Sequence, residues 1–220
     1  GSGQLREGTS PNALKDYSST LEESRADLFA LYYLADPKLV ELGITPNDTA
    51  YKAEYISYIR NGIFTQFVRI DLGKKVTQAH MQGRKMISEW CFEKGKADNV
   101  IEKRIRDGKT YFVINDYAKL RTLFGELLKE LQRIKSEGDY EAGKKLVTTY
   151  GINIDPQLHK ELKERYAALD LKPYGGFINP DITPVEKDGK IIDYKVDYPK
   201  DFLQQMRDYG KKYSFLPVEN

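Results

Sequence analysis

Cysteine is almost absent from this 220-residue chain, and long apolar runs and an excess of either charge are absent as well. The single cysteine, Cys91, excludes an intrachain disulfide and fits a reducing compartment, so we expect a cytoplasmic location. No apolar run approaches the about 20 residues that a membrane-spanning helix needs. The 35 basic and 33 acidic side chains give a net charge of +2, which offers no basis for binding nucleic acid or an anionic membrane. We therefore expect neither of these partners.

The composition that remains is typical of a folded globular protein, with 31% charged and 12% aromatic residues. Helical spacing dominates and predicts helices over residues 21–35, 49–70, 76–93, 97–106, 116–136, 140–149, 155–169 and 200–213. A short strand is predicted at 111–114, and Asp188-Gly189 between two β-prone runs predicts a hairpin over 183–196. The expected fold class is mainly α, with a small β-hairpin-containing segment near the C-terminus.

The composition changes at Lys172, where a cluster of proline and glycine begins. We expect residues 1–171 to form a helical body. Residues 172–220 should form a Pro/Gly-rich segment with the hairpin and a terminal helix, within the same domain. Cys91 is expected on the buried side of its helix, and His159 is expected to be exposed and without function on a polar helix face.

Three carboxylates, Glu22, Glu23 and Asp27, precede a stretch that is apolar or aromatic on nearly every face, residues 28–34. Glu23 and Asp27 are four residues apart and so share one face of a helix. Buried carboxylates need a cation, hydrogen-bond donors or a metal, which makes the trio a candidate metal or acid–base site. The alternative is an ordinary helix start, because Ser19 and Glu22 have the spacing of a capping box. Acidic residues in a first turn also interact favourably with the helix dipole, by about 0.3–1 kcal/mol each.

Several segments resemble one known family, the dipeptidyl peptidase III family. Residues 19–28 resemble its glutamate motif, whose usual form is Glu-Glu-Cys/Ala/Ser-Arg-Ala-Glu/Asp. Residues 78–84, Gln-Ala-His-Met-Gln-Gly-Arg, resemble its Gln-Ala-His-x-x-x-Arg helix. Residues 94–100 and 135–143 are similar to further segments of bacterial-type members. The resemblance thus extends over nearly the whole chain, and several ordered matches are more specific than one acidic motif.

This resemblance implies a role for five side chains. It implies that Glu23 is a zinc ligand, and that Glu22 and Asp27 hold the zinc-binding histidines by hydrogen bonds. Many members have Glu in place of Asp27, whose side chain is one methylene shorter. It also implies that His80 stabilises the oxyanion or holds the substrate carbonyl, and that Arg84 binds the peptide; an N–H donor and a guanidinium fork suit these roles. From the residues alone, His80 is more simply an ordinary helix histidine and Arg84 a surface cation.

The family's other zinc motif, His-Glu-x-x-Gly-His, supplies two ligands and the general base, and the chain's two histidines do not form it. The resemblance therefore implies the C-terminal part of the helical catalytic lobe of a zinc-dependent exopeptidase, beginning just after that motif. Such enzymes remove dipeptides from the N-terminus of short peptides.

We expect this part alone to be inactive and to bind zinc poorly, because zinc sites use three or four ligands. It should associate with the missing N-terminal part of the same protein, or with itself. The alternatives are a non-catalytic helical domain that binds a protein or a peptide, and a degenerate peptidase that binds peptides without cutting them.

Overall fold

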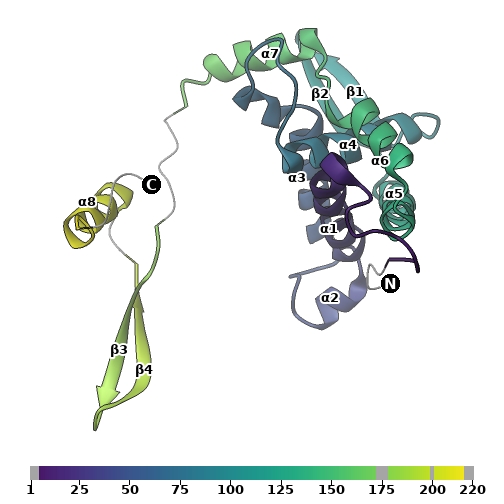
Figure 1. Ribbon diagram of the computed structural model, residues 1–220. Coiled ribbons are helices and arrows are strands. Elements are labelled where there is room, and N and C mark those ends of the chain that lie inside the picture. Colours follow the sequence, from purple (N-terminus) through teal and green to yellow (C-terminus); the bar gives the residue numbers. More distant parts are fainter. Residues whose placement is uncertain (1–4, 172–177, 199–200, 216–220) are drawn as a thin grey trace. The chain divides into compact units, whose positions relative to one another are not determined.

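A computed structural model describes residues 5–171, 178–198 and 201–215. The chain divides into two compact units, Gly1–Leu169 and Asp170–Asn220. The fold is mainly α, as predicted from the sequence, and Figure 1 labels its elements. That the two units form one domain stays a prediction.

The first unit is a bundle of helices with one small hairpin. Its helices are α1 (Ser18–Leu34), α2 (Pro37–Glu41), α3 (Ala50–Ile63), α4 (Ala79–Lys94), α5 (Tyr117–Glu137), α6 (Tyr140–Leu146) and α7 (Pro156–Ala167). The hairpin is β1 (Ile101–Arg106) with β2 (Lys109–Ile114). A 3-10 turn, Thr65–Arg69, follows α3, and a π turn, Val147–Gly151, follows α6.

Aspartate caps place the starts of several helices where the sequence predicts them. The Asp116 side chain accepts from the Lys119 N–H at 2.8 Å and begins α5. Asp155 accepts from two N–H groups at the start of α7, with proline in the first turn. Gly138, in the left-handed conformation with φ 65°, ends α5. Local chemistry therefore sets these boundaries.

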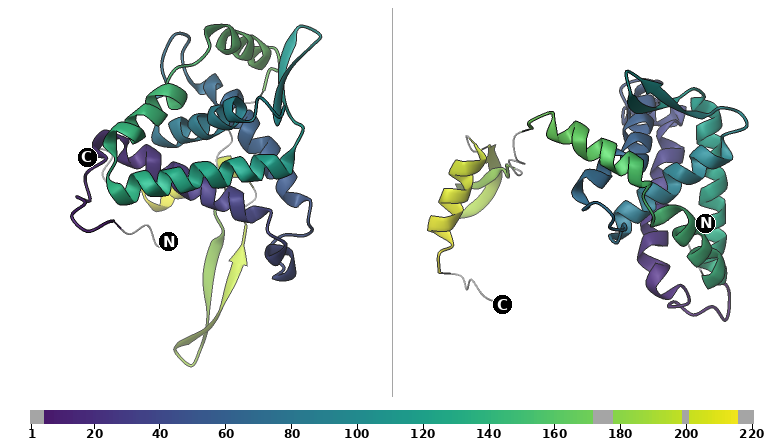
Figure 2. Two further views of the ribbon diagram at one scale, coloured as in Figure 1. Left: turned by 90° about the vertical axis from the view of Figure 1, so that its right-hand side faces the viewer. Right: turned by 90° about the horizontal axis from the view of Figure 1, so that it is seen from above.

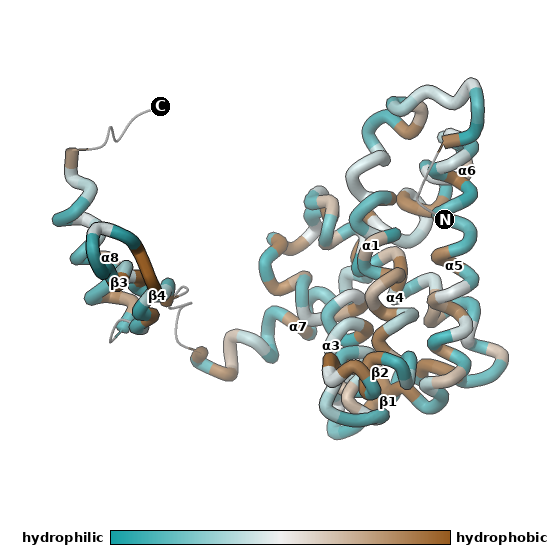
Figure 3. The backbone as a smooth tube through the Cα atoms, turned by 90° about the horizontal axis from the view of Figure 1, so that it is seen from below, coloured by the Kyte–Doolittle hydropathy of each residue, from teal (hydrophilic) through white to brown (hydrophobic). Residues whose placement is uncertain are grey.

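The core lies where α1 packs against α4 and α5, and where α4 packs against α3 (Figure 2). Leu28 and Leu31 of α1 and Leu120, Phe124 and Leu127 of α5 are buried in it. From α3 and α4 it receives Tyr55, Ile59, Met86 and Ile87. Figure 3 shows hydrophobic residues recurring at intervals along these helices, as their one-sided burial requires.

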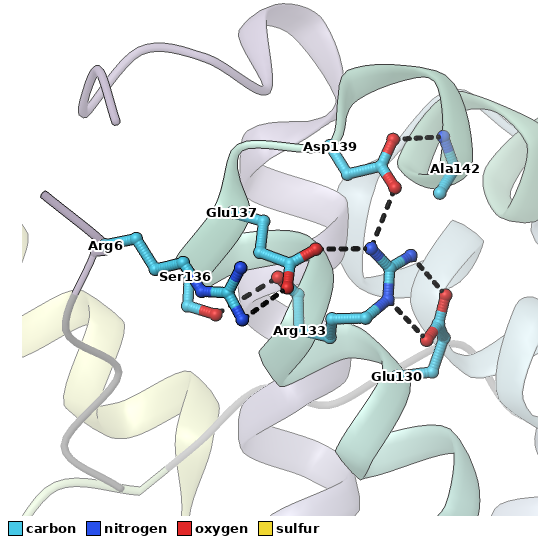
Figure 4. Close-up of polar contacts among 7 residues, drawn as sticks. All are labelled: Arg6, Glu130, Arg133, Ser136, Glu137, Asp139 and Ala142. Atoms are coloured by element: carbon cyan, nitrogen blue, oxygen red, sulfur yellow. Dashed lines mark hydrogen bonds and ion pairs between the residues drawn. The ribbon is translucent and has the colours of Figure 1, made fainter. Parts of the chain in front are cut away.

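An arginine cluster fixes the chain around the end of α5 (Figure 4). Arg133 donates to Glu130 at 2.7 Å, to Glu137 at 2.8 Å and to Asp139 at 2.9 Å. Asp139 also caps α6 through the Ala142 N–H, and Arg6 pairs with Glu137 at 2.9 Å. The cluster ties together the end of α5, the start of α6 and the segment that leads into α1.

The helix predicted over residues 97–106 is wrong. Residues 101–106 form β1, which pairs with β2 across a tight turn at Asp107 and Gly108, with φ values of 50° and 70°. The strand predicted at 111–114 is confirmed as part of β2. Asp107-Gly108 takes the left-handed conformation at both positions, so the chain reverses there, and residues 101–106 are extended because they pair with residues 109–114.

Two helices are shorter than predicted. The helix expected over 49–70 ends at Ile63 and continues as the separate 65–69 turn. The helix expected over 140–149 ends at Leu146 and gives way to the π turn. A helix that is apolar or aromatic on nearly every face, as residues 28–34 are, is expected to be buried on most sides. That expectation is wrong here, because Phe29 and Tyr33 are 54% and 44% exposed.

His159 is not exposed, contrary to the prediction. Its side chain is 2% exposed, and its Nε2 lies 3.0 Å from the carbonyl oxygens of both Phe67 and Ile70. Because both partners are acceptors, Nε2 carries the proton. Its neighbour on α7, Lys163, donates to the Val68 carbonyl at 2.7 Å, so α7 holds the 65–69 turn in place. Cys91 is buried as predicted, and burial raises the pKa of its thiol.

The second unit contains the predicted hairpin and terminal helix. Strands β3 (Asp181–Lys187) and β4 (Lys190–Asp197) pair antiparallel, with Asp188 and Gly189 at φ values of 52° and 72° in the turn. Helix α8 spans Phe202–Lys212. Its Gln205 side chain donates to the Asn179 carbonyl at 2.8 Å and links the helix to the start of the hairpin segment.

Candidate functional site

The acidic segment lies on α1, where α1 and α4 approach closely. A Cβ atom at Gly83 of α4 would lie 2.7 Å from the Ser24 Oγ of α1. Ser24 is fully buried and donates back to the Thr20 carbonyl at 2.6 Å, while Thr20 Oγ1 donates to Gln82 Oε1 of α4 at 2.7 Å. Small residues on both helices therefore let the two backbones come together beside Glu23 and Asp27.

Glu23 and His80 face each other across this contact. His80 Nδ1 lies 3.4 Å from Glu23 Oε2, and the two side chains are 47% and 41% exposed. A carboxylate and an imidazole thus meet at a solvent-accessible place on adjoining helices. Both keep room to bind a further group.

Asp27 lies one turn farther along α1 and contacts α3 instead. Tyr58 of α3, which is 8% exposed, donates its hydroxyl to Asp27 Oδ2 at 2.8 Å. Burial, followed by the nearby Asp27 charge, raises the pKa of Tyr58 well above its usual range, so it stays a neutral donor. Tyr58 is a residue that sequence reasoning missed. Nothing in its local pattern signals the contact, which joins residues 31 positions apart.

Glu22 points to a different neighbour, α5. It accepts from Arg25 Nη2 at 2.6 Å and Nε at 3.2 Å, and from Lys135 of α5. These hydrogen bonds lower the pKa of Glu22 to about 2, and the bond from Arg25 has the largest effect. The capping-box interpretation of Glu22 is wrong, because α1 begins at Ser18, so that Ser19 lies inside the helix, and the cap residue, Tyr17, makes no side-chain cap. Glu22 is thus an ionised anchor between α1 and α5 in this structure.

Arg84 lies one turn after His80 on α4 and faces a cleft of its own. Its Nη1 lies 3.5 Å from Oε1 of Gln66, a residue that is 5% exposed. Gln66 is held by its amide nitrogen, which donates to the carbonyls of Gly62 at 3.1 Å and Met81 at 3.0 Å. Gln66 therefore aims its amide oxygen at Arg84. It is a second residue that the sequence did not single out.

We call this hollow the polar cleft. It has a volume of about 510 Å³ and is lined by Glu54, Ser57, Tyr58, Asn61, Thr65, Gln66, Val68, Arg69, Met81, Arg84 and Tyr166. A neighbouring, more apolar groove shares Glu54, Ser57 and Tyr58 with it and includes Asp27. Asp27 thus lines the groove and Arg84 the polar cleft, two hollows that share three residues, whereas Glu22 lines another hollow with Lys135.

The five residues singled out from the sequence are therefore brought together only in part. Glu23 and His80 form a pair, Asp27 lines the apolar groove, and Arg84 lines the polar cleft. Within the residues described, no three His, Cys, Asp or Glu side chains are arranged to hold a metal ion. A carboxylate is a suitable zinc ligand, so the chemistry of Glu23 fits that role, and a complete site would need two or three further ligands.

In the parts of the chain that the structure describes, no helix has the length and apolarity to cross a membrane.

Comparisons with known proteins point to one group. A family model described as Peptidase family M49 matches residues 6–197. The solved structure of DPP III from Caldithrix abyssi is similar to this chain with a TM-score of 0.54 and 23% sequence identity, over 74% of this chain and 28% of that one. At this identity the likeness shows the fold, and the chain spans little more than a quarter of that structure's length. A search of curated proteins found no match.

Proposed function

The chain belongs to peptidase family M49, and from this premise we propose that it is part of a zinc-dependent dipeptidyl peptidase in which Glu23 supplies one metal ligand. The observation that carries the proposal is the pairing of Glu23 with His80 at 3.4 Å, where α1 and α4 meet. A carboxylate that coordinates a metal must be accessible, and Glu23 is 41% exposed and forms no ion pair with a lysine or arginine within the described residues. The remaining ligands would come from residues outside this chain.

Asp27 would serve as the acceptor that orients a metal-binding imidazole. Its Oδ2 already accepts from Tyr58, which fixes the side chain and leaves Oδ1 for a second donor. Ligating histidines commonly donate their other N–H to a carboxylate, which sets their tautomer and ring orientation. Because Asp27 is shorter than Glu, the Tyr58 hydroxyl helps to define where that acceptor lies.

His80 and Arg84 would act on the peptide. The imidazole of His80 can donate an N–H toward the oxygen of the scissile carbonyl, where negative charge develops during peptide hydrolysis. Arg84, four residues later on the same helix, can hold a carbonyl or carboxylate with its guanidinium fork. Gln66 keeps Arg84 turned toward the polar cleft.

The test uses the longest polypeptide that the gene encodes. We expect it to bind zinc and to release dipeptides from the N-terminus of short peptides. Glu23→Gln should lower zinc affinity by about 100-fold or more, since even outer partners of zinc ligands contribute about 10–100-fold. Glu164→Gln is the matched control, because Glu164 is 67% exposed on α7 and pairs only loosely with Lys160.

The proposal is refuted if Glu23→Gln keeps both its zinc and its activity. A wild-type polypeptide that binds peptides but releases no dipeptide would instead favour the non-catalytic alternative.

A further inference from the structure

Among the half-buried arginines of the first unit, Arg84 differs from the others in having no carboxylate partner within the described residues. Four others are half-buried, namely Arg25, Arg121, Arg133 and Arg165, and each forms an ion pair with a carboxylate at 2.6–3.5 Å. Arg84 is also half-buried, yet within the described residues it has no carboxylate partner. Among the described residues, its side chain forms one hydrogen bond, to the amide oxygen of Gln66 at 3.5 Å. Partial burial of a guanidinium without an anion is unfavourable, so this place would favour a bound carboxylate.

The missing partner would approach through the polar cleft. Arg84 lines that cleft, and Arg69, from the 65–69 turn, lines it as well. Arg69 is exposed and likewise makes no ion pair among the residues described. The one carboxylate in the lining is Glu54 of α3, which pairs with neither arginine. Two unpaired guanidinium groups against one carboxylate leave the cleft with a positive balance.

The arginines are also held in place before any ligand arrives. Gln66 is anchored to two backbone carbonyls and presents its oxygen to Arg84. The turn that carries Arg69 is clamped from α7 by His159 and Lys163, which bind the carbonyls of Phe67, Ile70 and Val68. A preorganised site loses less conformational entropy on binding, so weak ligands can still be held.

We propose that the polar cleft is a carboxylate subsite, in which Arg84 and Arg69 bind the C-terminal carboxylate of a short peptide. A guanidinium fork matches a carboxylate in shape and can bind it through two parallel N–H bonds. A peptide is the fitting source because Arg84 shares a helix face with His80, about 6 Å farther along α4. This inference rests on the proposed function, which places the substrate backbone at His80.

The test compares two peptides on the chain as it stands. Tetra-alanine and tetra-alanine amide differ only in the terminal carboxylate, and binding is followed by NMR titration of backbone amides around the cleft. We expect the free acid to bind in the millimolar range and about tenfold more tightly than the amide, as one charge-assisted hydrogen bond would give. Acetate should compete with the free acid at the same amides.

Variants then assign the preference to the two arginines. Arg84→Gln and Arg69→Gln should each bring the free acid to within about threefold of the amide, while Arg106→Gln should leave the tenfold difference unchanged. Arg106 is the control because its side chain is 84% exposed at the tip of the β1–β2 hairpin. Circular dichroism spectra establish that each variant is folded, and Arg69→Gln, at an exposed position, keeps the test valid if Arg84→Gln unfolds.

Equal binding of the two peptides would overturn the carboxylate subsite and leave the peptidase proposal standing. Absence of binding by either peptide would overturn it as well. Loss of zinc or dipeptide release in Glu23→Gln bears on the proposed function alone, so the two failures are distinguishable. An amidated peptide that contains aspartate tests the source of the carboxylate. If it binds as tightly as the free acid, the cleft binds an acidic side chain, and the assignment to the C-terminus is overturned.

Discussion

Gly62→Ala tests whether α3 and α4 pack as closely as the structure requires. A Cβ atom at this position would lie 2.4 Å from the backbone carbonyl oxygen of Arg84 and 2.1 Å from Ser88 Oγ. The serine can rotate, but the carbonyl belongs to the α4 backbone and cannot. The two helices must therefore separate, and Arg84 must move with α4.

The magnitude follows from two opposing effects. Overpacking a well-packed contact costs about 1–3 kcal/mol, and the contact with backbone favours the upper end. Replacing a helical glycine by alanine recovers about 1 kcal/mol of helix propensity. The net destabilisation should be about 2 kcal/mol, which lowers the melting temperature of a chain of this size by about 4–8 °C.

The assay is thermal unfolding at neutral pH, followed by far-ultraviolet circular dichroism. Gly83→Ala is the graded comparison, because its nearest neighbour is the Ser24 Oγ at 2.7 Å, a side-chain atom that can shift. It should lower the melting temperature by less than Gly62→Ala does. Gly210→Ala in α8, with nothing within 4 Å of the added atom, should not lower it. A Gly62→Ala variant as stable as the wild type would refute the close packing of α3 on α4, and with it the placement of Arg84.

Two further predictions concern buried or paired side chains. His159→Phe removes the shared donor of the Phe67 and Ile70 carbonyls, so chemical denaturation should show a loss of about 1–3 kcal/mol; a loss no larger than that of exposed Lys160→Ala would contradict the role of the histidine. The pKa of Glu22 is lowered from 4.5 to about 2, so its contribution is present above pH 4.5 and is lost as the pH falls toward 2. Glu22→Gln should therefore flatten the fall in stability between pH 5 and pH 2, by at most about 1 kcal/mol because Glu22 is 43% exposed. An unchanged acid profile in melting experiments would argue against the pairing with Arg25 and Lys135.

The helix boundaries that could be predicted are those with a local chemical cause. Asp116 and Asp155 cap α5 and α7 through N–H groups two or three residues away, so the signal lies within a short window of sequence. The β3–β4 turn is of the same kind, because Asp188-Gly189 accepts the left-handed conformation at both positions.

The first hairpin shows that the same signal can be overlooked. Asp107-Gly108 is the same dipeptide as Asp188-Gly189, yet the sequence of residues 97–106 also permits a helix. Short segments commonly satisfy both periods, and tertiary contacts then decide. Here Glu161 of α7 accepts from the Thr110 N–H at 2.7 Å and holds the hairpin from outside it.

The residues of the candidate site also differ in whether their signal is local in the sequence or depends on a distant contact. The motif residues Glu23 and His80 could be named from the sequence, because each stands in a segment that resembles a known family. Tyr58 and Gln66 could not, because their partners Asp27 and Arg84 lie 31 and 18 residues away on other helices. The Glu22 side chain points toward α5 because it binds Lys135, which lies 113 residues away in the sequence.

By itself, then, the sequence determined the mainly helical class, the aspartate-capped helix starts, the β3–β4 turn and the resemblance of the acidic segment to a peptidase motif. These depend on interactions within a few residues, or on identities that are read directly. The tertiary structure alone decided that His159 is buried, that Glu22 faces α5 while Glu23 faces His80, and that Arg84 contacts Gln66 beside the polar cleft. Each of these depends on which distant segment packs against the residue, and the burial and pairing of a side chain are set by that neighbour.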